Sequence, residues 1–445
     1  MSCRMQEIDI LINAGKALLL DSSDTELDEA AIAVNDGLII DIGPSGEIAP
    51  KYKAEKTINA ADSLVMPGFV NSHTHAAMTC FRGMADDLEL MDWLHNYIFP
   101  AEARNVDQEL AYWGSLLACA EMIKSGTTTF CDMYIFEDET AKAAKKAGMR
   151  CLLGEVLFDF PSPNFKSPEE GLAYTRMLIE KWHDDPLVNI FVEPHALYTC
   201  SPNLLAAAKK LADDHQIPLG VHLLENKAEK EQLQQKFGKG AVPFLEDIDY
   251  LNERFLAFHC VHLSAEDIQL FARYGCKVSH NPASNMKLAS GVAPVPDMLR
   301  AGITVGLGTD GCASNNTLDM IKEMSMAAKL HKAARLDPTV MDAKTVVRMA
   351  TIEGARALGM EKITGSLQIG KKADIIIIDL NKPHLTPIYN EYSHLVYAAN
   401  GADVDTVIIN GKVVMEKRRL LTLDETEVMR KVGEIAVKIK KSFQK

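Results

Sequence analysis

The stretch MPGFVNSHTHAAMTCFRG, residues 66–83, decides how the rest of this chain is interpreted. It begins apolar, and His73 and His75 stand two residues apart just before the hydrophobicity stops. Successive side chains of a strand point to opposite faces, so both imidazoles lie on one side of the predicted strand. Two buried imidazoles are costly unless something binds them, and a divalent metal ion does this well. A lone H-x-H pair is more often two hydrogen-bonded core histidines, so the metal hypothesis depends on ligands further along the chain.

The composition is that of a globular protein without a basic surface. Its 445 residues are 47% hydrophobic and 24% charged, with a formal net charge of −14. Nucleic acid and anionic membranes reward a basic face, so neither is expected as a partner. Nine scattered cysteines without C-x-x-C spacing, Cys3 among them, indicate a reducing compartment and no disulfide framework. Without an apolar signal segment or membrane-length run, the expected location is cytoplasmic.

Both ends of the chain show the pattern of short strands. Apolar runs are separated by the turn signals Asn35-Asp36-Gly37 and Asn410-Gly411. From Asp424 the chain is amphipathic and rich in lysine, which predicts a solvated terminal helix. These patterns predict a small β-sandwich domain built from residues 1–64 and 367–445, the second part ending in the helix.

Between these ends, residues 65–366 alternate between strand-like runs and segments of helical period. The strand-like runs cover residues 69–75, 127–133, 149–158, 188–200, 218–225, 254–263, 276–282 and 303–311. Eight strands separated by helices predict a TIM-type (β/α)₈ barrel, in which chemistry collects at the carboxyl ends of the strands. Residues 159–170 are rich in proline and serine and are expected to form a surface loop.

Polar groups follow several of these strands. The fifth to eighth strands bring, in chain order, His222, Glu225, His259, His262, His280 and Asp310. Three histidines and one carboxylate from strands one, five and eight suit Zn²⁺ and leave one position for water. Each residue alone has a structural explanation, and their joint placement at strand ends favours the metal site.

The same residues carry a resemblance to a known family. The motifs are HTH, HLLE, FHCVHL, SHNPASNMKLASGVAPV, GLGTDGCASNN and PGFVNSHTHAAMTCFRGMADDLELMDWL. Together they resemble the amidohydrolase superfamily, and within it the 5-methylthioadenosine/S-adenosylhomocysteine deaminases, over nearly the whole chain. The resemblance implies hydrolytic deamination of the adenine base of a 5′-substituted adenosine by a metal-activated water, giving the inosine analogue and ammonia.

The resemblance also implies roles for individual residues. One divalent metal ion would be held by His73, His75, His222 and Asp310; Zn²⁺ is expected, and Fe²⁺ or Mn²⁺ also suits this donor set. Glu225 matches the family's proton-shuttling glutamate, and His259 matches the histidine that contacts the water. Glu102, His195, Glu225 and Asp310 would face the substrate, and Glu102 would accept hydrogen bonds from the ribose hydroxyls. The alternative for Glu102 is a surface glutamate that opens a helix. Trp93 would pack on the nucleoside, and its alternative is a position in the core.

One position departs from the family pattern. Some members have an arginine near the amino-acid tail of S-adenosylhomocysteine, where this chain has Glu155. A carboxylate there would repel the tail, so we expect methylthioadenosine, adenosine and 5′-deoxyadenosine to be preferred. Lys166 or Arg176 would be the alternative source of a positive charge.

Other functions are compatible with parts of this pattern. One is an aminohydrolase of the same branch acting on guanine, 8-oxoguanine or a triazine. Another is a non-catalytic scaffold, which the complete ligand set and Glu225 disfavour. The base-editing deaminase signature, H-x-E with P-C-x-x-C, is absent, so the expected substrate is a free small molecule rather than a polynucleotide. A homo-oligomer is compatible with the resemblance, and the sequence does not decide it.

Overall fold

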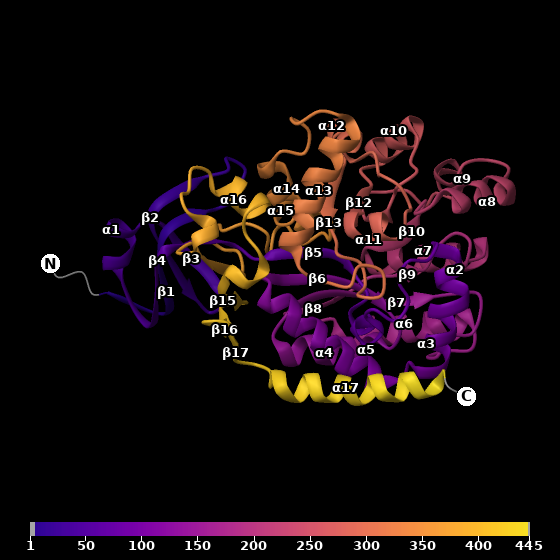
Figure 1. Ribbon diagram of the computed structural model, residues 1–445, viewed down its shortest axis with the longest axis horizontal. Helices are drawn as coiled ribbons and strands as arrows, with labels where there is room; N and C mark the ends of the chain where they lie inside the picture. The colour runs from indigo at the N-terminus through magenta and orange to yellow at the C-terminus, as the bar shows by residue number, and fades with distance from the viewer. Residues whose placement is uncertain (1–4, 444–445) are drawn as a thin grey trace.

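Strands from both ends of the chain join in one sheet in the computed structural model, which describes residues 5–443 (Figure 1). Its order is β17-β16-β15-β14-β4-β1-β2-β3. The strands are β1 Gln6–Leu18, β2 Glu26–Asn35, β3 Leu38–Pro44, β4 Tyr52–Pro67, β14 Ile375–Asp379, β15 Val404–Ile409, β16 Lys412–Glu416 and β17 Arg419–Leu420. The central contact is β4 against β14, so a segment before the middle of the chain pairs with one after it. Both ends of the chain therefore contribute strands to one eight-stranded sheet.

The two predicted hairpin turns are present. Asp36 and Gly37 have φ of 50° and 76°, and Asn410 and Gly411 have φ of 50° and 74°. This left-handed region suits Asn, Asp and Gly, which explains the turn residues. The turns also touch each other, since a Cβ added to Gly411 would lie 2.5 Å from the Cα of Gly37.

The middle of the chain forms two parallel sheets, and all eight predicted strands are present. The sheets have the orders β5-β6-β7-β8, with β9 also pairing with β7, and β10-β11-β12-β13. The strands are β5 Phe69–Thr74, β6 Thr127–Tyr134, β7 Arg150–Leu157, β8 Val188–Ile190, β9 Glu193–Pro194, β10 Leu219–Leu223, β11 Phe255–His259, β12 Lys277–His280 and β13 Thr304–Leu307. The fourth predicted strand is thus divided into β8 and β9, because the intervening Val192 bonds to Pro218 and Gly220 instead.

Backbone hydrogen bonds link the two parallel sheets on both sides. On one side the N–H of Gly220 donates to the carbonyl of Val192 at 2.9 Å. On the other the N–H of Asp310 donates to the carbonyl of His73 at 2.9 Å. The second bond joins the first predicted strand to the last, and it brings two of the predicted metal ligands together.

Helices follow most of these strands, as the sequence predicts. The longer ones are α4 Gln108–Lys124, α5 Glu137–Ala147, α6 Pro168–Trp182, α7 Pro202–His215, α8 Lys227–Phe237, α10 Ala265–Tyr274, α13 Met320–Arg335 and α17 Glu425–Ser442. The short helices are α1 Ser45–Ile48, α2 Leu90–Asp92, α3 Phe99–Asn105, α9 Ala241–Asp247, α11 Pro282–Lys287, α12 Val295–Arg300, α14 Ala343–Met349, α15 Ile352–Ala357 and α16 Glu391–Tyr397. The short η segments are η1 Ala49–Lys51, η2 Ala76–Phe81, η3 Trp93–Ile98, η4 Pro383–Leu385 and η5 Gly401–Asp403. Asp107, Ser201 and Ser264 cap α4, α7 and α10 by accepting backbone N–H bonds, which is why these helices begin where they do.

The terminal helix α17 is present, but it is not simply solvated. In Figure 1 it runs along the lower edge beneath α4 and α5. Its buried side chains are Val428, Val432, Ile435 and Ile439, a spacing of three to four residues that forms one face of a helix. Near the C-terminal end of α17, Lys438 forms an ion pair with Glu109 of α4, with Nζ and Oε2 2.8 Å apart. These buried side chains pack against the part of the molecule that contains the two parallel sheets. In the chain, however, α17 comes directly after strands of the eight-stranded sheet.

Cysteine and membrane predictions can be compared with the described residues. Cys3 lies outside them, and the other eight cysteines are buried with unpaired thiols. Among residues 5–443, no helix combines the length and apolar character needed to cross a bilayer.

Candidate active site

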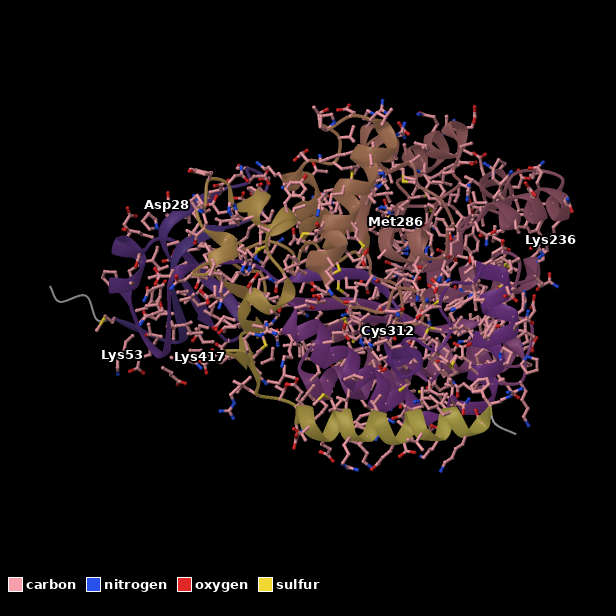
Figure 2. All side chains as sticks on the ribbon, in the orientation of Figure 1. Asp28, Lys53, Lys236, Met286, Cys312 and Lys417 are labelled. Atoms are coloured by element: carbon pink, nitrogen blue, oxygen red, sulfur yellow. The ribbon has the colours of Figure 1, made fainter. Side chains whose placement is uncertain are left out.

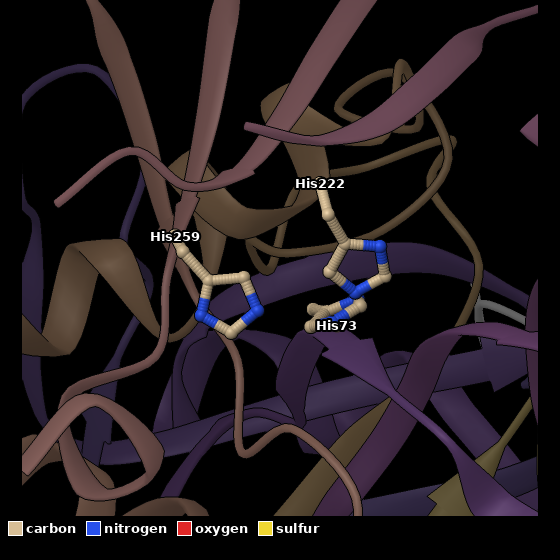
Figure 3. Close-up of side chains that lie close together, drawn as sticks. All are labelled: His73, His222 and His259. Carbon is tan, nitrogen blue, oxygen red and sulfur yellow. The ribbon is translucent and has the colours of Figure 1, made fainter. Parts of the chain in front are cut away.

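The predicted metal ligands meet at the carboxyl ends of β5, β10 and β13. Figure 3 shows the His73, His222 and His259 imidazoles gathered in one place. Their ligand nitrogens lie within 4.8 Å of one another, and so do the ligand atoms of His73, His75 and Asp310. Asp310 Oδ1 lies 3.1 Å from His75 Nε2 and 3.5 Å from His73 Nε2. His73 belongs to both groups, so it lies at the centre of the cluster.

Hydrogen bonds leave the Nε2 atoms of two of these histidines free to bind an ion. His75 Nδ1 donates to the carbonyl of Met133, and His222 Nδ1 donates to that of His195 at 3.1 Å. Such bonds fix the tautomer in which Nε2 carries a lone pair. Neither nitrogen of the fully buried His73 has a hydrogen-bond partner among residues 5–443. Buried imidazoles without partners are costly, so the donor set fits a divalent cation.

The charges in the cluster also fit a cation. Burial lowers the pKa of His73 to about 3, and it lowers the pKa of His222 well below its usual range, so both rings are neutral. Burial opposes charge at His75 too, but the neighbouring Asp310 outweighs it and raises the pKa of His75 to about 9. Burial likewise raises the pKa of Asp310, but the adjacent imidazoles of His73 and His75 hold it well below its usual range. The buried Asp310 carboxylate therefore attracts a positive charge, either the proton that His75 holds beside it or a metal ion.

Asp310 is held by groups whose role the sequence reasoning missed. Its Oδ2 accepts hydrogen bonds from Ser284 Oγ at 2.6 Å and Ser314 Oγ at 2.8 Å. Its Oδ1 accepts one from the backbone N–H of Gly311 at 2.8 Å and faces the histidines. Both serines belong to motifs quoted above, SHNPASNMK and GCASNN, and that is the signal that could have identified them.

The two predicted proton-handling residues lie beside the cluster. Glu225 Oε1 is 3.8 Å from His259 Nδ1, and burial raises the pKa of Glu225. His259 Nδ1 has a nearer partner in Asn285 Oδ1, at 2.9 Å. The backbone of Glu225 is anchored by Glu229 of α8, whose Oε2 accepts its N–H at 2.7 Å. Asn285 and Glu229 were also missed, because nothing in their spacing indicates which group they contact.

A cavity opens beside the cluster. Its polar lining includes His75, His195, His222, Glu225, His259, Asp310 and Glu102. Its apolar lining is Met78, Leu90, Trp93, Leu94, Ile98, Phe99, Met133, Ile135, Val156, Phe158 and Leu288. Among residues 5–443, no lysine or arginine lines it. The cavity therefore combines an apolar wall with an acidic and histidine-rich floor.

The residues expected to contact substrate line this cavity. Glu102 of α3 is buried, and its Oε1 accepts a hydrogen bond from Tyr134 Oη at 2.7 Å. Burial raises the pKa of Glu102 to about 7, although the bond from Tyr134 acts in the opposite direction. Burial also lowers the pKa of His195 to about 3, so its ring is neutral. Trp93 lines the cavity, and its indole N–H donates a hydrogen bond to the carbonyl of Ala85. Its side chain is therefore held in the core and also forms part of the cavity wall.

The interpretation of Glu155 was wrong. Its side chain is fully buried and does not line the cavity. It accepts hydrogen bonds from the backbone N–H groups of Phe136 and Glu137, where α5 begins, and from the side-chain amide of Asn164. A carboxylate suits the positive end of a helix and its free N–H groups. Glu155 therefore holds the start of α5 and cannot repel a substrate in the cavity.

Two other strand-end histidines lie outside the cluster. His262 Nε2 bonds to the carbonyl of Ser290 at 2.8 Å, and His280 Nε2 lies 3.0 Å from His331 Nε2. Their partners explain both as structural residues, the alternative that the sequence allowed for each histidine alone.

With this geometry, the chain can be compared with known proteins. The Amidohydrolase family matches residues 64–414, which cover His73, His75, His222 and Asp310. The chain belongs to the amidohydrolase family. This amidohydrolase is 62% identical over 440 residues to 5-methylthioadenosine/S-adenosylhomocysteine deaminase 1 of Syntrophus aciditrophicus, covering 99% of each chain. It is 46% identical to a 5′-deoxyadenosine deaminase of Methanosarcina mazei, covering 96% of this chain and 98% of that one.

A solved structure has the same fold as this amidohydrolase. An adenosine deaminase from Xanthomonas campestris with bound zinc superimposes with a TM-score of 0.97. It is 37% identical in sequence, and the match covers 98% of this chain and 100% of that one. The predicted family membership and enzyme class are therefore confirmed.

Proposed function

We propose that this amidohydrolase removes the 6-amino group of adenine nucleosides by hydrolysis. The observation that carries the proposal is the cluster centred on His73, which borders a cavity lined by both Glu225 and Glu102. The proposed metal ligands His75, His222 and Asp310 thus line the same cavity as two carboxyl groups. Glu225 is the proposed proton carrier, and Glu102 is proposed to accept hydrogen bonds from the ribose hydroxyls. Relatives of this chain bear the names of adenosine-derivative deaminases.

His73, His75, His222 and Asp310 would hold one divalent metal ion, and Zn²⁺ is our choice over Fe²⁺ and Mn²⁺. The zinc in the related adenosine deaminase supports that choice. A bound ion of this kind supplies a water whose pKa is lowered from ~15.7 towards ~7. His75 and His222 are pre-oriented for this role by bonds to backbone carbonyls.

The protein groups divide the proton transfers between them. The oxygen of water adds to C6 of the adenine ring, and Glu225 passes a water proton to the ring nitrogen beside C6. Glu225 then passes the remaining proton of the new C6 hydroxyl to the 6-amino group, the bond between C6 and that exocyclic nitrogen breaks, ammonia leaves, and the base becomes hypoxanthine with a C6 carbonyl. Burial raises the pKa of Glu225, which favours a carboxyl that accepts and returns a proton. His259 and Asp310 orient the water and stabilise the charge that develops on its oxygen.

The fold proposed for this site is a closed (β/α)₈ barrel over residues 65–366. The hydrogen bonds that link the two parallel sheets on both sides support closure. Residues 1–64 and 367–445 would form the small β-sandwich domain, with α17 as its extension onto the barrel.

The lining of the cavity favours substrates with an uncharged 5′ group. An amino-acid tail carries a carboxylate, and no lysine or arginine among residues 5–443 lines the cavity to pair with it. The apolar wall instead suits a methylthio or methyl group. We therefore expect methylthioadenosine, adenosine and 5′-deoxyadenosine to react with higher kcat/KM than S-adenosylhomocysteine.

Ammonia release from a panel of compounds tests the proposal. The zinc-loaded protein is assayed with those four nucleosides, guanine, 8-oxoguanine and a triazine. Highest turnover on an adenine nucleoside supports the proposal. Turnover on guanine or a triazine alone would replace the substrate class while keeping the chemistry, and no turnover on any compound would contradict an aminohydrolase.

A further inference from the structure

Helix α11 contacts two of the reacting groups although none of its own residues faces the cavity. This six-residue helix, Pro282–Lys287, lies in the SHNPASNMK motif, to which the proposed chemistry assigns no role. Two adjacent side chains, those of Ser284 and Asn285, are fully buried and reach different partners. Ser284 Oγ donates to Asp310 Oδ2 at 2.6 Å, and Asn285 Oδ1 accepts from His259 Nδ1 at 2.9 Å.

The partners of α11 are the site residues with the least favourable backbone. His259 has φ of 68° and Asp310 has φ of 62°, in the left-handed region that side-chain-bearing residues rarely adopt. Such conformations cost free energy and persist only where surrounding contacts hold them. The bonds from Ser284 and Asn285 are contacts of this kind.

The bond from Asn285 also decides how His259 presents its ring. An amide oxygen can only accept, so His259 Nδ1 carries the hydrogen, and the other ring nitrogen is left for the reacting water. The competing acceptor, Glu225 Oε1, is farther from His259 Nδ1, at 3.8 Å. Asn285 therefore keeps His259 from pairing with the carboxyl that must move protons.

We infer that α11 is a positioning helix, in which Ser284 orients the metal-binding carboxylate of Asp310 and Asn285 sets the tautomer and orientation of His259. The inference rests on the proposed function, since it concerns the groups that perform that reaction. Its two halves have separate consequences. Ser284 acts on a metal ligand, whereas Asn285 acts on a residue outside the proposed ligand set.

Kinetics of Asn285 variants test one half. Asn285→Leu keeps the size but removes the acceptor, and Asn285→Asp keeps an acceptor oxygen. We expect Asn285→Leu to lower kcat for adenosine about 10–100-fold with KM within about twofold, and Asn285→Asp to retain most of kcat. Met286→Ala, on the same helix at an exposed position labelled in Figure 2, is the matched control and should match the wild type.

Zinc affinity, measured by chelator competition, tests the other half independently of turnover. Ser284→Ala should weaken zinc binding about tenfold, and Asn285→Leu should leave it within about twofold. Equal zinc and kcat losses in both variants, or equal kcat losses in Asn285→Leu and Asn285→Asp, would overturn the inference. So would full activity and affinity in all of them. A wild-type protein that binds zinc but deaminates nothing would contradict the proposed function instead, while the zinc measurement still judges Ser284.

Discussion

The floor and the outer wall of the cavity are built on different principles. The floor, around His73 and Asp310, consists of strand ends held by many hydrogen bonds to backbone and serine groups. The wall, from α2 to α3 and the loops after β6 and β7, is mainly apolar, and Glu102 is its buried carboxyl. In the proposed reaction the floor would supply a defined geometry of metal ligands, whereas the wall would supply shape and one polar contact for the substrate. Changes to the floor should alter turnover and metal binding, and changes to the wall should alter KM and substrate choice.

The largest expected effect comes from Asp310→Ala on the floor. Without this carboxylate the cluster loses a proposed ligand and the negative charge that lies 3.1 Å from His75 Nε2, so zinc content should fall well below one per chain. Activity should fall on the order of 10⁴-fold. Metal analysis with steady-state kinetics measures both, and a variant that keeps its zinc and its turnover would remove Asp310 from the site.

Glu225→Gln separates chemistry from metal binding within the floor. The amide cannot carry a proton back and forth, so kcat should fall about 10²–10⁴-fold while zinc content is unchanged. Glu231→Gln, an exposed change on the neighbouring helix α8, is the matched control. Unaltered turnover in Glu225→Gln would assign the proton transfers to another group.

Glu102→Gln tests whether the wall recognises the ribose. Losing a charged acceptor for a diol should lower kcat/KM for adenosine about 10–100-fold, chiefly through KM. The same variant should lose little with 2′,3′-dideoxyadenosine, which lacks both hydroxyls. Equal losses on the two substrates would place Glu102 in a structural role instead.

The smallest effect on catalysis is expected from Glu155→Gln, behind the wall. The order of kcat/KM among the four nucleosides should stay as in the wild type, because Glu155 does not line the cavity. A changed order of kcat/KM values would show that Glu155 does affect substrate specificity.

The same variant should change how stability depends on pH. Burial raises the pKa of Glu155 to about 7, against hydrogen bonds from two backbone N–H groups and Asn164 that lower it, while an unfolded glutamate titrates near 4.5. The folded chain therefore binds this proton more tightly, and its contribution to stability is lost as pH rises from about 4.5 through about 7. Urea unfolding at pH 5 and pH 8 should show a smaller decline for Glu155→Gln than for the wild type, by on the order of 1 to 3 kcal/mol. An identical decline would show that Glu155 stays ionised in the fold.

Much of the floor was predictable, because its histidines and Asp310 follow strands and strands can be recognised by short apolar runs. Asn35-Asp36-Gly37 and Asn410-Gly411 were predictable as turns for a similar local reason, since few residues accept positive φ. Glu155 shows the limit of this reasoning. Its position in the chain suggested the substrate tail, but a strand residue one place over points to the opposite face and meets a helix start. The motif around Ser284 marks it as a candidate, but the motif does not name Asp310 as its partner. The partners of Asn285 and Glu229 were out of reach, since His259 lies 26 residues from Asn285 in the chain and the contact of Glu229 depends on the geometry of a turn.

The sequence by itself determined the alternation of strands and helices, the turn positions, and the identity of the side chains able to bind a cation. These follow from local periodicity and from the chemistry of histidine and carboxylate groups. Only the tertiary structure decided that α17 packs against α4, that Glu155 holds α5 while Glu102 faces the cavity, and that α11 reaches Asp310 and His259. The physical reason is that burial and hydrogen-bond partners are set by contacts between segments far apart in the chain, and these contacts leave no periodic signal in any one of them.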